Sequence, residues 1–432
     1  MQYFHAQKDD AVLNKLHQLT LAVAEQYPSR EKLDILEKST LSLYTPTEPR
    51  LSKEPMKISV LQENLAQGLN IVSRAVSPRS TYPILANVLV SAEDGRLKLS
   101  ATDRELGITC WLGAKIEEPG ATTVPARTFS DLVATFPNET IQMNLAVRTQ
   151  TLHLTAGRSN AEIKGIDAQE FPPMPEPDKS GGIEIPVSEF KEMIQQVVFA
   201  ASRDDARPVL TGVLITVDGK TITLAAADGF RLSVRKAELK KAADQPMRAI
   251  VPAKALNELA RIAPDDGEVV RMMLPPGRGQ VIFSLKNAEL RSQLVEGAFP
   301  EYQQIIPNGY KTRTIVSTDA FLKAAKQAEI FARESSHIAR IDIKPGDGKA
   351  PGTMEISAQS EETGSNDAKM DATVEGLPIL IAFNVRFLRE VLDVVKTPNV
   401  AIETTAAAAP GVVRPVNEGD FLHVIMPMHL GK

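Results

Sequence analysis

The stretch Arg207–Val234 reads RPVLTGVLITVDGKTITLAAADGFRLSV. Apolar and polar residues alternate on both sides of the turn Asp218-Gly219. This pattern predicts a β-hairpin, because Asp-Gly favours the backbone twist that joins two antiparallel strands. A second version occurs at Thr81–Cys110, TYPILANVLVSAEDGRLKLSATDRELGITC. A unit that is written more than once indicates a repeat architecture.

Shorter motifs return at a common spacing. The matched pairs are Val124-Pro125-Ala126 with Val251-Pro252-Ala253 (251 − 124 = 127), Asn160-Ala161-Glu162-Ile163 with Asn287-Ala288-Glu289-Leu290, Phe171-Pro172 with Phe299-Pro300, and, more faintly, Phe190 with Phe321. We therefore predict three domains, residues 56–181, 182–309 and 310–432, after an N-terminal extension and linker of residues 1–55. Each unit reads helix, strands, helix, strands, which predicts an α+β fold with three similar domains.

Composition limits the class of protein. The chain has 432 residues, 43% of them hydrophobic and 24% charged, which is ordinary for a globular protein with real cores. Its one cysteine, Cys110, excludes an internal disulfide and fits a reducing compartment. The sequence lacks a signal-peptide core and any apolar run long enough to span a bilayer, so we expect a cytoplasmic protein. The net charge of −5 means that contact with nucleic acid requires cations gathered on one face.

The sequence offers no catalytic constellation. There is no G-x-x-x-x-G-K-[ST] phosphate loop, and the six histidines never occur at metal-ligand spacing. Gly277-Arg278-Gly279 is typical of a turn, and the pairs Asp204-Asp205, Asp265-Asp266 and Glu361-Glu362 are typical of solvated turns or caps. We therefore expect no metal and no cofactor, and binding rather than catalysis. A hydrolase or transferase built on repeated α+β units is the alternative from another class.

Several motifs resemble one family. TYPILANVLV, AADGFRL, EFPPMP, FPEYQQIIP and above all the terminal HVIMPMHL resemble the bacterial DNA polymerase III beta subunit, the beta sliding clamp, over Met56–Leu430. The resemblance implies a non-enzymatic processivity factor, in which two three-domain chains close head to tail into a ring around double-stranded DNA. Helices would line the hole, and a separate ATP-driven loader would open the ring. A peptide-binding scaffold that does not encircle DNA remains the alternative.

The resemblance also implies where DNA is contacted. Loop and helix cations would face the phosphates without reading sequence, with the closest candidates being Arg74, Arg79, Arg203, Arg207 and Lys254. Other cations on the predicted helices are Lys191, Arg261, Lys323, Lys326, Arg386, Arg389 and Lys396. The alternative for any one of them is that it only solvates an exposed helix face and does not contact DNA.

Partner proteins are the second implication. Family clamps capture short linear peptides of polymerase subunits, the clamp loader and repair proteins in a groove between the second and third domains. Its residues here would be Leu210, Ala227, Gly229, Phe230, Arg231, Leu232, Pro307, Ala408, Pro410, Val424, Met426, Pro427, Met428, His429 and Leu430. Phe230 replaces a frequent histidine, and Ala408 replaces a frequent larger aliphatic residue, so the peptide preference is left open.

Ring closure and the extension complete the expectations. In a homodimer, Arg158, Ala161 and Ile163 of one copy would meet Ile330 and Phe331 of the other. In the extension, Gln18–Ala22 reads QLTLA and is similar to the Gln-Leu-x-Leu-Phe peptides that clamps bind, except for Ala22. A weak, tethered self-ligand is one interpretation, and the apolar face of a short helix is the other.

Overall fold

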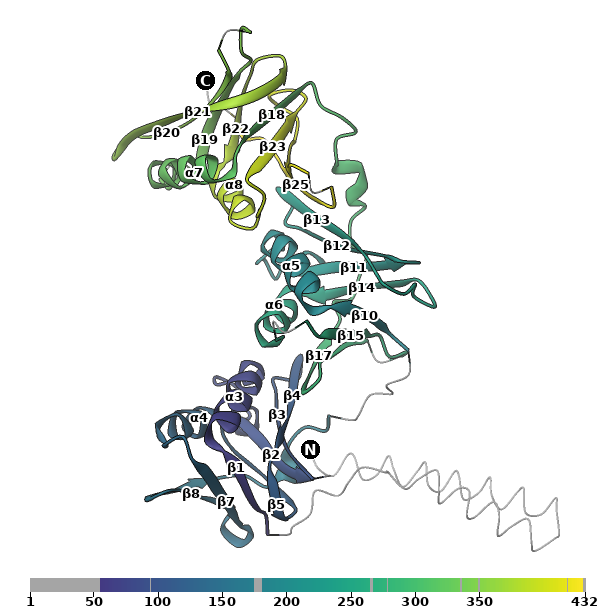
Figure 1. Ribbon diagram of the computed structural model, residues 1–432, viewed down its shortest axis with the longest axis vertical. Coiled ribbons are helices and arrows are strands. Elements are labelled where there is room, and N and C mark those ends of the chain that lie inside the picture. The colour runs from purple at the N-terminus through teal and green to yellow at the C-terminus, as the bar shows by residue number, and fades with distance from the viewer. Residues whose placement is uncertain are drawn as a thin grey trace, which may run out of the picture. The chain divides into compact units, whose positions relative to one another are not determined.

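The computed structural model describes residues 55–429, except 94, 175–180, 265–266, 278, 335, 349 and 418. The described residues hold six α-helices, two in each predicted domain, set against antiparallel strands (Figure 1). The predictions for residues 1–54, Asp265-Asp266, Arg278 and Leu430 lie outside the described residues.

The first repeat places two helices over two groups of strands. Its helices are α3 (Gln62–Val72) and α4 (Ala126–Thr135). Its strands are β1 (Lys57–Leu61), β2 (Asn87–Glu93), β3 (Arg96–Thr102), β4 (Leu106–Gly113), β5 (Lys115–Glu118), β6 (Gly120–Pro125), β7 (Thr140–Ala146), β8 (Thr151–Ala156) and β9 (Ser159–Lys164). The apolar spacing of Leu61, Leu65, Leu69, Val72 and Val76 predicts one helix from Leu61 to Val76, but α3 ends at Val72 and a 3-10 turn follows to Ala75.

The second repeat follows the same order. Its helices are α5 (Val187–Val197) and α6 (Ala253–Ile262). Its strands are β10 (Ile183–Pro186), β11 (Gly212–Asp218), β12 (Thr221–Ala227), β13 (Arg231–Glu238), β14 (Met247–Pro252), β15 (Val269–Met273), β16 (Gln280–Ser284) and β17 (Ala288–Gln293). The predicted hairpin is confirmed: β11 pairs with β12, and Gly219 in the turn has φ +55°.

The third repeat has the longest strands. Its helices are α7 (Thr318–Ala332) and α8 (Val385–Leu392). Its strands are β18 (Thr312–Ser317), β19 (Ile338–Lys344), β20 (Gly352–Ser360), β21 (Gly364–Gly376), β22 (Ile379–Asn384), β23 (Asn399–Thr404), β24 (Gly411–Pro415) and β25 (Phe421–Ile425).

Five of the six described helices begin directly after a proline or a capping serine or asparagine. Pro125, Pro186 and Pro252 end a strand directly before α4, α5 and α6, where the fixed φ of proline and its missing N–H are tolerated. In the third repeat, the side chains of Ser317 and Asn384 accept hydrogen bonds from the first turns of α7 and α8. In each repeat, the two helices contact each other.

Two strand pairs join successive repeats. At joint one, β4 of the first repeat pairs with β17 of the second, from Leu106↔Ser292 to Cys110↔Ala288. At joint two, β13 of the second repeat pairs with β25 of the third, from Arg231↔Ile425 to Arg235↔Phe421. These pairs create an eight-stranded and a twelve-stranded antiparallel sheet. Successive residues of a strand face opposite sides, so each joint has a side that faces the helices and an outer side.

Candidate functional site

The same backbone turn lies at both joints. At joint two, the Asp228 carboxylate accepts hydrogen bonds from the backbone N–H groups of Phe230 (2.9 Å) and Arg231 (3.1 Å). At joint one, the Asp103 carboxylate accepts in the same way from the backbone N–H groups two and three residues further on, those of Glu105 (3.0 Å) and Leu106 (2.7 Å). The turn then accepts one backbone bond from the neighbouring repeat, from Gln293 N to Glu105 O (2.9 Å) and from Met426 N to Phe230 O (2.8 Å).

The outer side of joint two is an apolar surface. Leu232 and Val234 of β13 and Val424 of β25 are buried there in one cluster with Phe299 and Tyr302, and Val209, Leu210 and Ile306 pack against it. Phe230, two residues before Leu232 in the chain, has 60% of its surface exposed. An exposed aromatic ring next to packed aliphatic side chains is suited to holding an apolar peptide side chain.

Most of the other predicted groove residues lie around this cluster or on the C-terminal tail. Ala227 belongs to the cluster, and Gly229 has φ +96° in the turn. Pro307, Pro410, Met426, Pro427 and Met428 are half-buried, whereas Ala408 and His429 are exposed. The tail is held by Met426 N donating to Phe230 O and by Met428 N donating to Ala382 O (2.8 Å). The prediction that these residues bind peptides remains a prediction.

Arg231 points to the helix side and not to the groove side. Its side chain is 8% exposed, and Nε donates to Asp228 Oδ2 (3.0 Å) while Nη2 donates to Phe199 O (2.6 Å). Nη1 donates to Glu390 on α8. Burial alone would raise the pKa of Glu390, but the hydrogen bond and charge of Arg231, together with Arg386, hold that pKa below its usual value.

A buried histidine lies on the same side of joint two. His423 Nδ1 lies 2.6 Å from Ser233 Oγ, and the imidazole ring lies 5.3 Å from the ring of Phe199. Burial, and after it the positive charge of Arg231, lowers the pKa of His423 well below its usual value. His423 is therefore neutral at pH 7, whereas Arg231 and Glu390 form a charged pair across joint two.

The outer side of joint one has the same frame, with walls that mix apolar and polar side chains. A cavity of about 600 Å³ is lined there by Ile84, Thr102, Arg104, Glu105, Gly107, Gln169, Glu170, Phe171, Pro172, Pro173, Met174, Gln280, Arg291, Ser292 and Gln293. Glu105 stands where joint two has Phe230, and Gly107 stands where it has Leu232. Arg104 has φ +79°, and its guanidinium lies 4.5 Å from the ring centre of Tyr82.

The predicted DNA-facing cations fall into two groups. Most of the helix cations are held by carboxylates, in the pairs Arg74–Glu258 (3.1 Å), Lys254–Asp103 (2.7 Å), Arg261–Glu258 (2.9 Å), Lys326–Asp393 (3.1 Å), Arg386–Glu390 (3.0 Å), Arg389–Glu329 (2.8 Å) and Lys396–Glu192 (3.1 Å). Arg79 and Arg203 are exposed loop residues. Arg207 is also exposed and forms an ion pair with Asp204, with Nε 3.2 Å from Oδ2. Arg261–Glu258 and Arg386–Glu390 are three and four residues apart on one helix, whereas the partners in the other pairs are far apart along the chain and could not be matched from the sequence.

Among the described residues, β5, β6, β9, β10, β14 and β22 end their sheets, and part of β21 is also unpaired on one side. Two of these open edges, on β9 and on β21, lie at the residues predicted for the dimer interface. The outermost strand β9 pairs only with β8, and the Gly364–Ala372 part of β21 pairs only with β20. On β9, Ala161 is half-buried, Ile163 is buried and Arg158 precedes the strand as an exposed residue. Ile330 is 59% exposed at the end of α7, next to the half-buried Phe331, whose ring lies 4.0 Å from where a side chain on Gly364 would begin.

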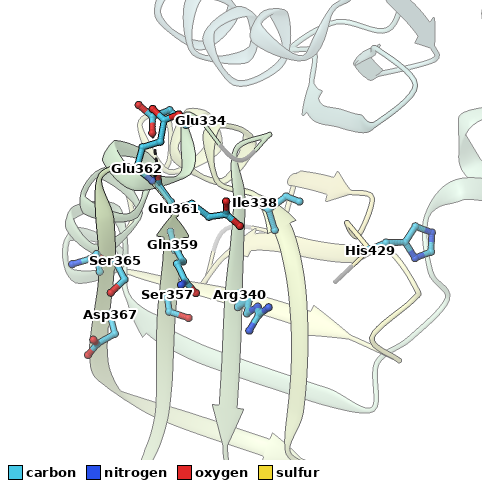
Figure 2. A pocket seen from close by; sticks show the side chains of 13 residues that line it. Glu334, Ile338, Arg340, Ser357, Gln359, Glu361, Glu362, Ser365, Asp367 and His429 are labelled. Carbon is cyan, nitrogen blue, oxygen red and sulfur yellow. Dashed lines mark hydrogen bonds between the residues drawn. The ribbon is translucent and has the colours of Figure 1, made fainter. Parts of the chain in front are cut away.

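An acidic hollow borders the second edge. It has a volume of about 680 Å³ and includes Glu334, Glu361, Glu362 and Asp367, with Arg340 in its floor. Figure 2 shows Glu334, Glu361 and Glu362 near one end of the hollow and His429 at the opposite side. Glu334 accepts a hydrogen bond from Ser360 Oγ (2.7 Å). Within the described residues, no other charge pairs with these carboxylates.

Other classes of site find little support in the described part of the chain. That part contains no group of three or more His, Cys, Asp or Glu side chains that could hold a metal ion. None of its helices has the length and hydropathy needed to cross a membrane. Cys110 is buried in β4, and burial raises the pKa of its thiol to about 11, so it stays protonated at neutral pH.

Comparisons with known proteins agree with the repeat structure. Residues 56–175, 184–301 and 303–429 match the family models of the DNA polymerase III beta subunit, N-terminal, central and C-terminal domains. The beta sliding clamp of Bacillus subtilis is 30% identical over 383 residues, covering 86% of this chain and 99% of that protein. That of Synechococcus elongatus is 32% identical over 381 residues, covering 87% and 100%.

Solved structures give the same result. The crystal structure of the sliding clamp from Bacillus subtilis matches with a TM-score of 0.82 at 29% identity, over 88% of this chain and all of that one. The sliding clamp of Pseudomonas aeruginosa bound to griselimycin matches with a TM-score of 0.80 at 28% identity, over 87% of this chain and all of that one. Three similar domains, the shared turns at both joints and these matches lead to one conclusion: the chain belongs to the DNA polymerase III beta subunit family, the beta sliding clamps.

Proposed function

We propose that two copies of this sliding clamp close head to tail into a ring around double-stranded DNA and hold a polymerase on its template. Closure is supported by two of the open edges, on β9 and on the Gly364–Ala372 part of β21, because the residues predicted for the interface lie on or beside them. Unpaired strand edges are templates for addition of another strand. Two different edges on one chain form a head-to-tail contact, which gives a ring when the rotation closes.

The surroundings of the two edges are complementary. Ala161 offers apolar contact on the first edge, where Ile163 is buried in the core of its own chain, and Ile330 and Phe331 offer it beside the second. Arg158 would approach a surface that carries the acidic hollow of Figure 2. Opposite charges at an interface favour the correct orientation of the partners.

Phe331→Ala tests this closure. If Phe331 is buried between copies, its loss leaves a cavity that costs roughly 3–5 kcal/mol, so the dimer should dissociate at concentrations where wild type does not. Sedimentation at nanomolar to micromolar concentration measures this, with Phe387→Ala as a control aromatic away from both edges. An unchanged dimer in Phe331→Ala would contradict the assigned interface.

Arg79, Arg203 and Arg207 are the first candidates for contact with DNA phosphates. They lie on exposed loops. Arg207 is paired with Asp204, and most of the helix cations are likewise paired with carboxylates, which weakens their attraction for a polyanion. Such a surface holds DNA loosely, as sliding requires. Each arginine removed should lower the slope of log K against log salt by up to about one unit.

Retention on DNA separates encirclement from a scaffold role. A ring loaded onto circular DNA should stay bound in high salt and leave when the DNA is linearised, because the link is topological. Arg79→Ala with Arg207→Ala should reduce loading while leaving the dimer intact. Equal loss from circular and linear DNA would favour a peptide-binding scaffold without encirclement.

Partner capture at joint two is the second part of the proposal. The apolar cluster, the exposed ring of Phe230 and the half-buried methionines of the tail suit short linear peptides of polymerase subunits, a clamp loader and repair proteins. Deleting Met428–Lys432 should abolish binding of the peptide Gln-Leu-Ser-Leu-Phe without unfolding the domains. Work of this kind involves no catalysis and would take place in the cytoplasm.

A further inference from the structure

At joint two, Arg231 forms ion pairs with Asp228 and Glu390 on the side of the sheet away from the groove. Because Phe230 and Leu232 lie on the outer side, the intervening Arg231 projects to the helix side. There its guanidinium joins three elements: the turn through Asp228, the segment after α5 through Phe199 O, and α8 of the third repeat through Glu390. Two of these belong to the second repeat and one to the third.

Aromatic rings enclose the guanidinium. The Arg231 carbon Cζ lies 4.3 Å from the ring centre of Phe387 on α8 and 5.3 Å from that of Phe199. Phe199 packs against the cores of both repeats. A planar guanidinium suits such a site, because it forms directed hydrogen bonds in its plane and stacks on rings with its faces.

Glu390 is also linked to the exposed face of α8. Its Oε1 accepts from Arg386 Nε at 3.0 Å and lies 3.6 Å from Arg389 Nη2, while Oε2 accepts from Arg231. The groove turn therefore shares one carboxylate with the cations of the neighbouring repeat. If the two repeats moved apart and separated Arg231 from Glu390, each would leave a buried charge without its partner. The pair therefore strongly favours one arrangement of the two repeats.

We propose that Arg231 is a positioning residue for the peptide groove: through Glu390 it fixes the turn Asp228–Leu232 against the third repeat and thereby sets the spacing of the groove walls. It does so without contacting the peptide. The inference rests on the proposed capture of peptides at joint two. It adds that affinity for a partner depends on Glu390, a residue of α8 on the other side of the sheet.

Glu390→Gln is the decisive variant, because it keeps the shape of the side chain and removes the charge. We expect the Kd of a fluorescent Gln-Leu-Ser-Leu-Phe peptide to rise about tenfold or more, which corresponds to the usual size of coupling between sites. Arg231→Lys should weaken peptide affinity to an intermediate degree. A lysine keeps the positive charge near Glu390 but loses the hydrogen bonds that the guanidinium donates to Asp228 and Phe199 O. Glu390→Asp, which keeps the carboxylate, should recover part of the affinity.

Arg414→Gln is the matched control. Arg414 Nε donates to Glu403 Oε2 at 3.0 Å, so this is also an arginine–glutamate pair, but both partners lie within the third repeat. It should leave peptide affinity unchanged. If Arg231 contacted the peptide itself, Arg231→Lys would weaken binding and Glu390→Gln would not, and the proposal would fail. Equal weakening by Arg414→Gln would also overturn it, because the effect would then be general destabilisation.

The proposed function is checked in the same series. If wild type does not bind the peptide, or deletion of Met428–Lys432 leaves binding intact, the groove itself is misplaced. If wild type binds, the deletion abolishes binding and Glu390→Gln binds like wild type, only the positioning role is wrong. Should Glu390→Gln fail to fold by circular dichroism, Arg231→Lys and Glu390→Asp carry the test, and wild-type affinity in both would overturn the inference.

Discussion

Joint one and joint two share a backbone but differ in where their apolar side chains lie. On the helix side of joint one, Leu106, Ile108 and Cys110 meet Ala288 and Leu290 in a core that spans both repeats. Its outer side carries Thr109, Glu289 and Arg291, with Arg291 bonded to Glu289 (2.6 Å). At joint two, the helix side combines the charged and polar groups Arg231, Ser233 and His423 with Phe421 and Ile425 of the third repeat's core, and the outer side is apolar.

If joint two captures partner peptides as proposed, this difference explains why joint one does not. The apolar contact between the strands of joint one lies on the helix side, inside a core that spans both repeats. At joint two, Leu232, Val234 and Val424 place apolar side chains on the outer side as well, while Phe421 and Ile425 stay in the core on the helix side. The ion pair of Arg231 with Glu390 and the contact of Ser233 with His423 add polar contacts there. Repetition thus produced the frame, and substitution within the frame produced the site.

The largest expected effect comes from giving joint two the residue of joint one. Phe230→Glu places a carboxylate where the apolar peptide side chain would bind, so affinity should fall by ~2 kcal/mol or more, a factor of roughly 30. Fluorescence anisotropy with the Gln-Leu-Ser-Leu-Phe peptide measures it. Glu105→Ala at joint one is the control and should bind normally; the reverse ranking would move the groove to joint one.

Acid should weaken joint two before joint one. His423 is neutral in the folded chain with a lowered pKa, so below about pH 6.5 the unfolded chain takes up a proton that the folded chain refuses. Stability from this group is present above pH 6.5 and is lost at up to about 1.4 kcal/mol per pH unit as the pH falls. The loss of unfolding free energy between pH 7 and pH 5, measured by denaturant titration, should be smaller in His423→Gln.

Glu390 would add to this effect only at lower pH. Its folded pKa is lowered, so its contribution is present above the unfolded value near 4.5 and is lost as the pH falls through the folded value. At joint one, Cys110 stays protonated throughout this range. Identical pH dependence of wild type and His423→Gln would show that His423 does not control the acid response.

The turns themselves give a smaller contrast. Gly229 has φ +96°, so Gly229→Ala should destabilise the chain by ~1 kcal/mol, because a side chain in this region meets its own backbone. Arg104→Ala at the equivalent position should change stability by less than about 0.5 kcal/mol, since a side chain is already accommodated there and only an exposed contact with Tyr82 is lost. Chemical denaturation of both variants tests the ranking, and equal effects would argue against equivalent turns.

The smallest effect concerns the extension. If Gln18–Ala22 is a weak self-ligand of joint two, removing residues 1–55 should tighten binding of the free peptide severalfold, as a tethered competitor at up to about millimolar effective concentration would predict. Ala22→Phe should weaken binding instead. Isothermal titration of the three proteins decides this, and one affinity for all of them would leave the extension without a role at the groove.

Local signals made much of the fold predictable. The alternation on both sides of Asp218-Gly219 predicted β11 and β12, and the repeated spacing predicted three units with two helices each. The family resemblance placed the groove residues at joint two, and the apolar cluster lies there. The helix boundaries moved by a few residues, as at Val72, because a 3-10 turn continues the apolar spacing without continuing the α-helix.

The sequence by itself therefore determined the repeats, the strands, the turns and the family, because these depend on residues that are close together or on motifs read in order. Only the tertiary structure decided that Arg231 turns away from the groove and that the helix cations are neutralised. Glu390 is 159 positions from Arg231, and Glu258 is 184 positions from Arg74. No periodicity connects such residues, since their meeting depends on how whole strands and helices pack.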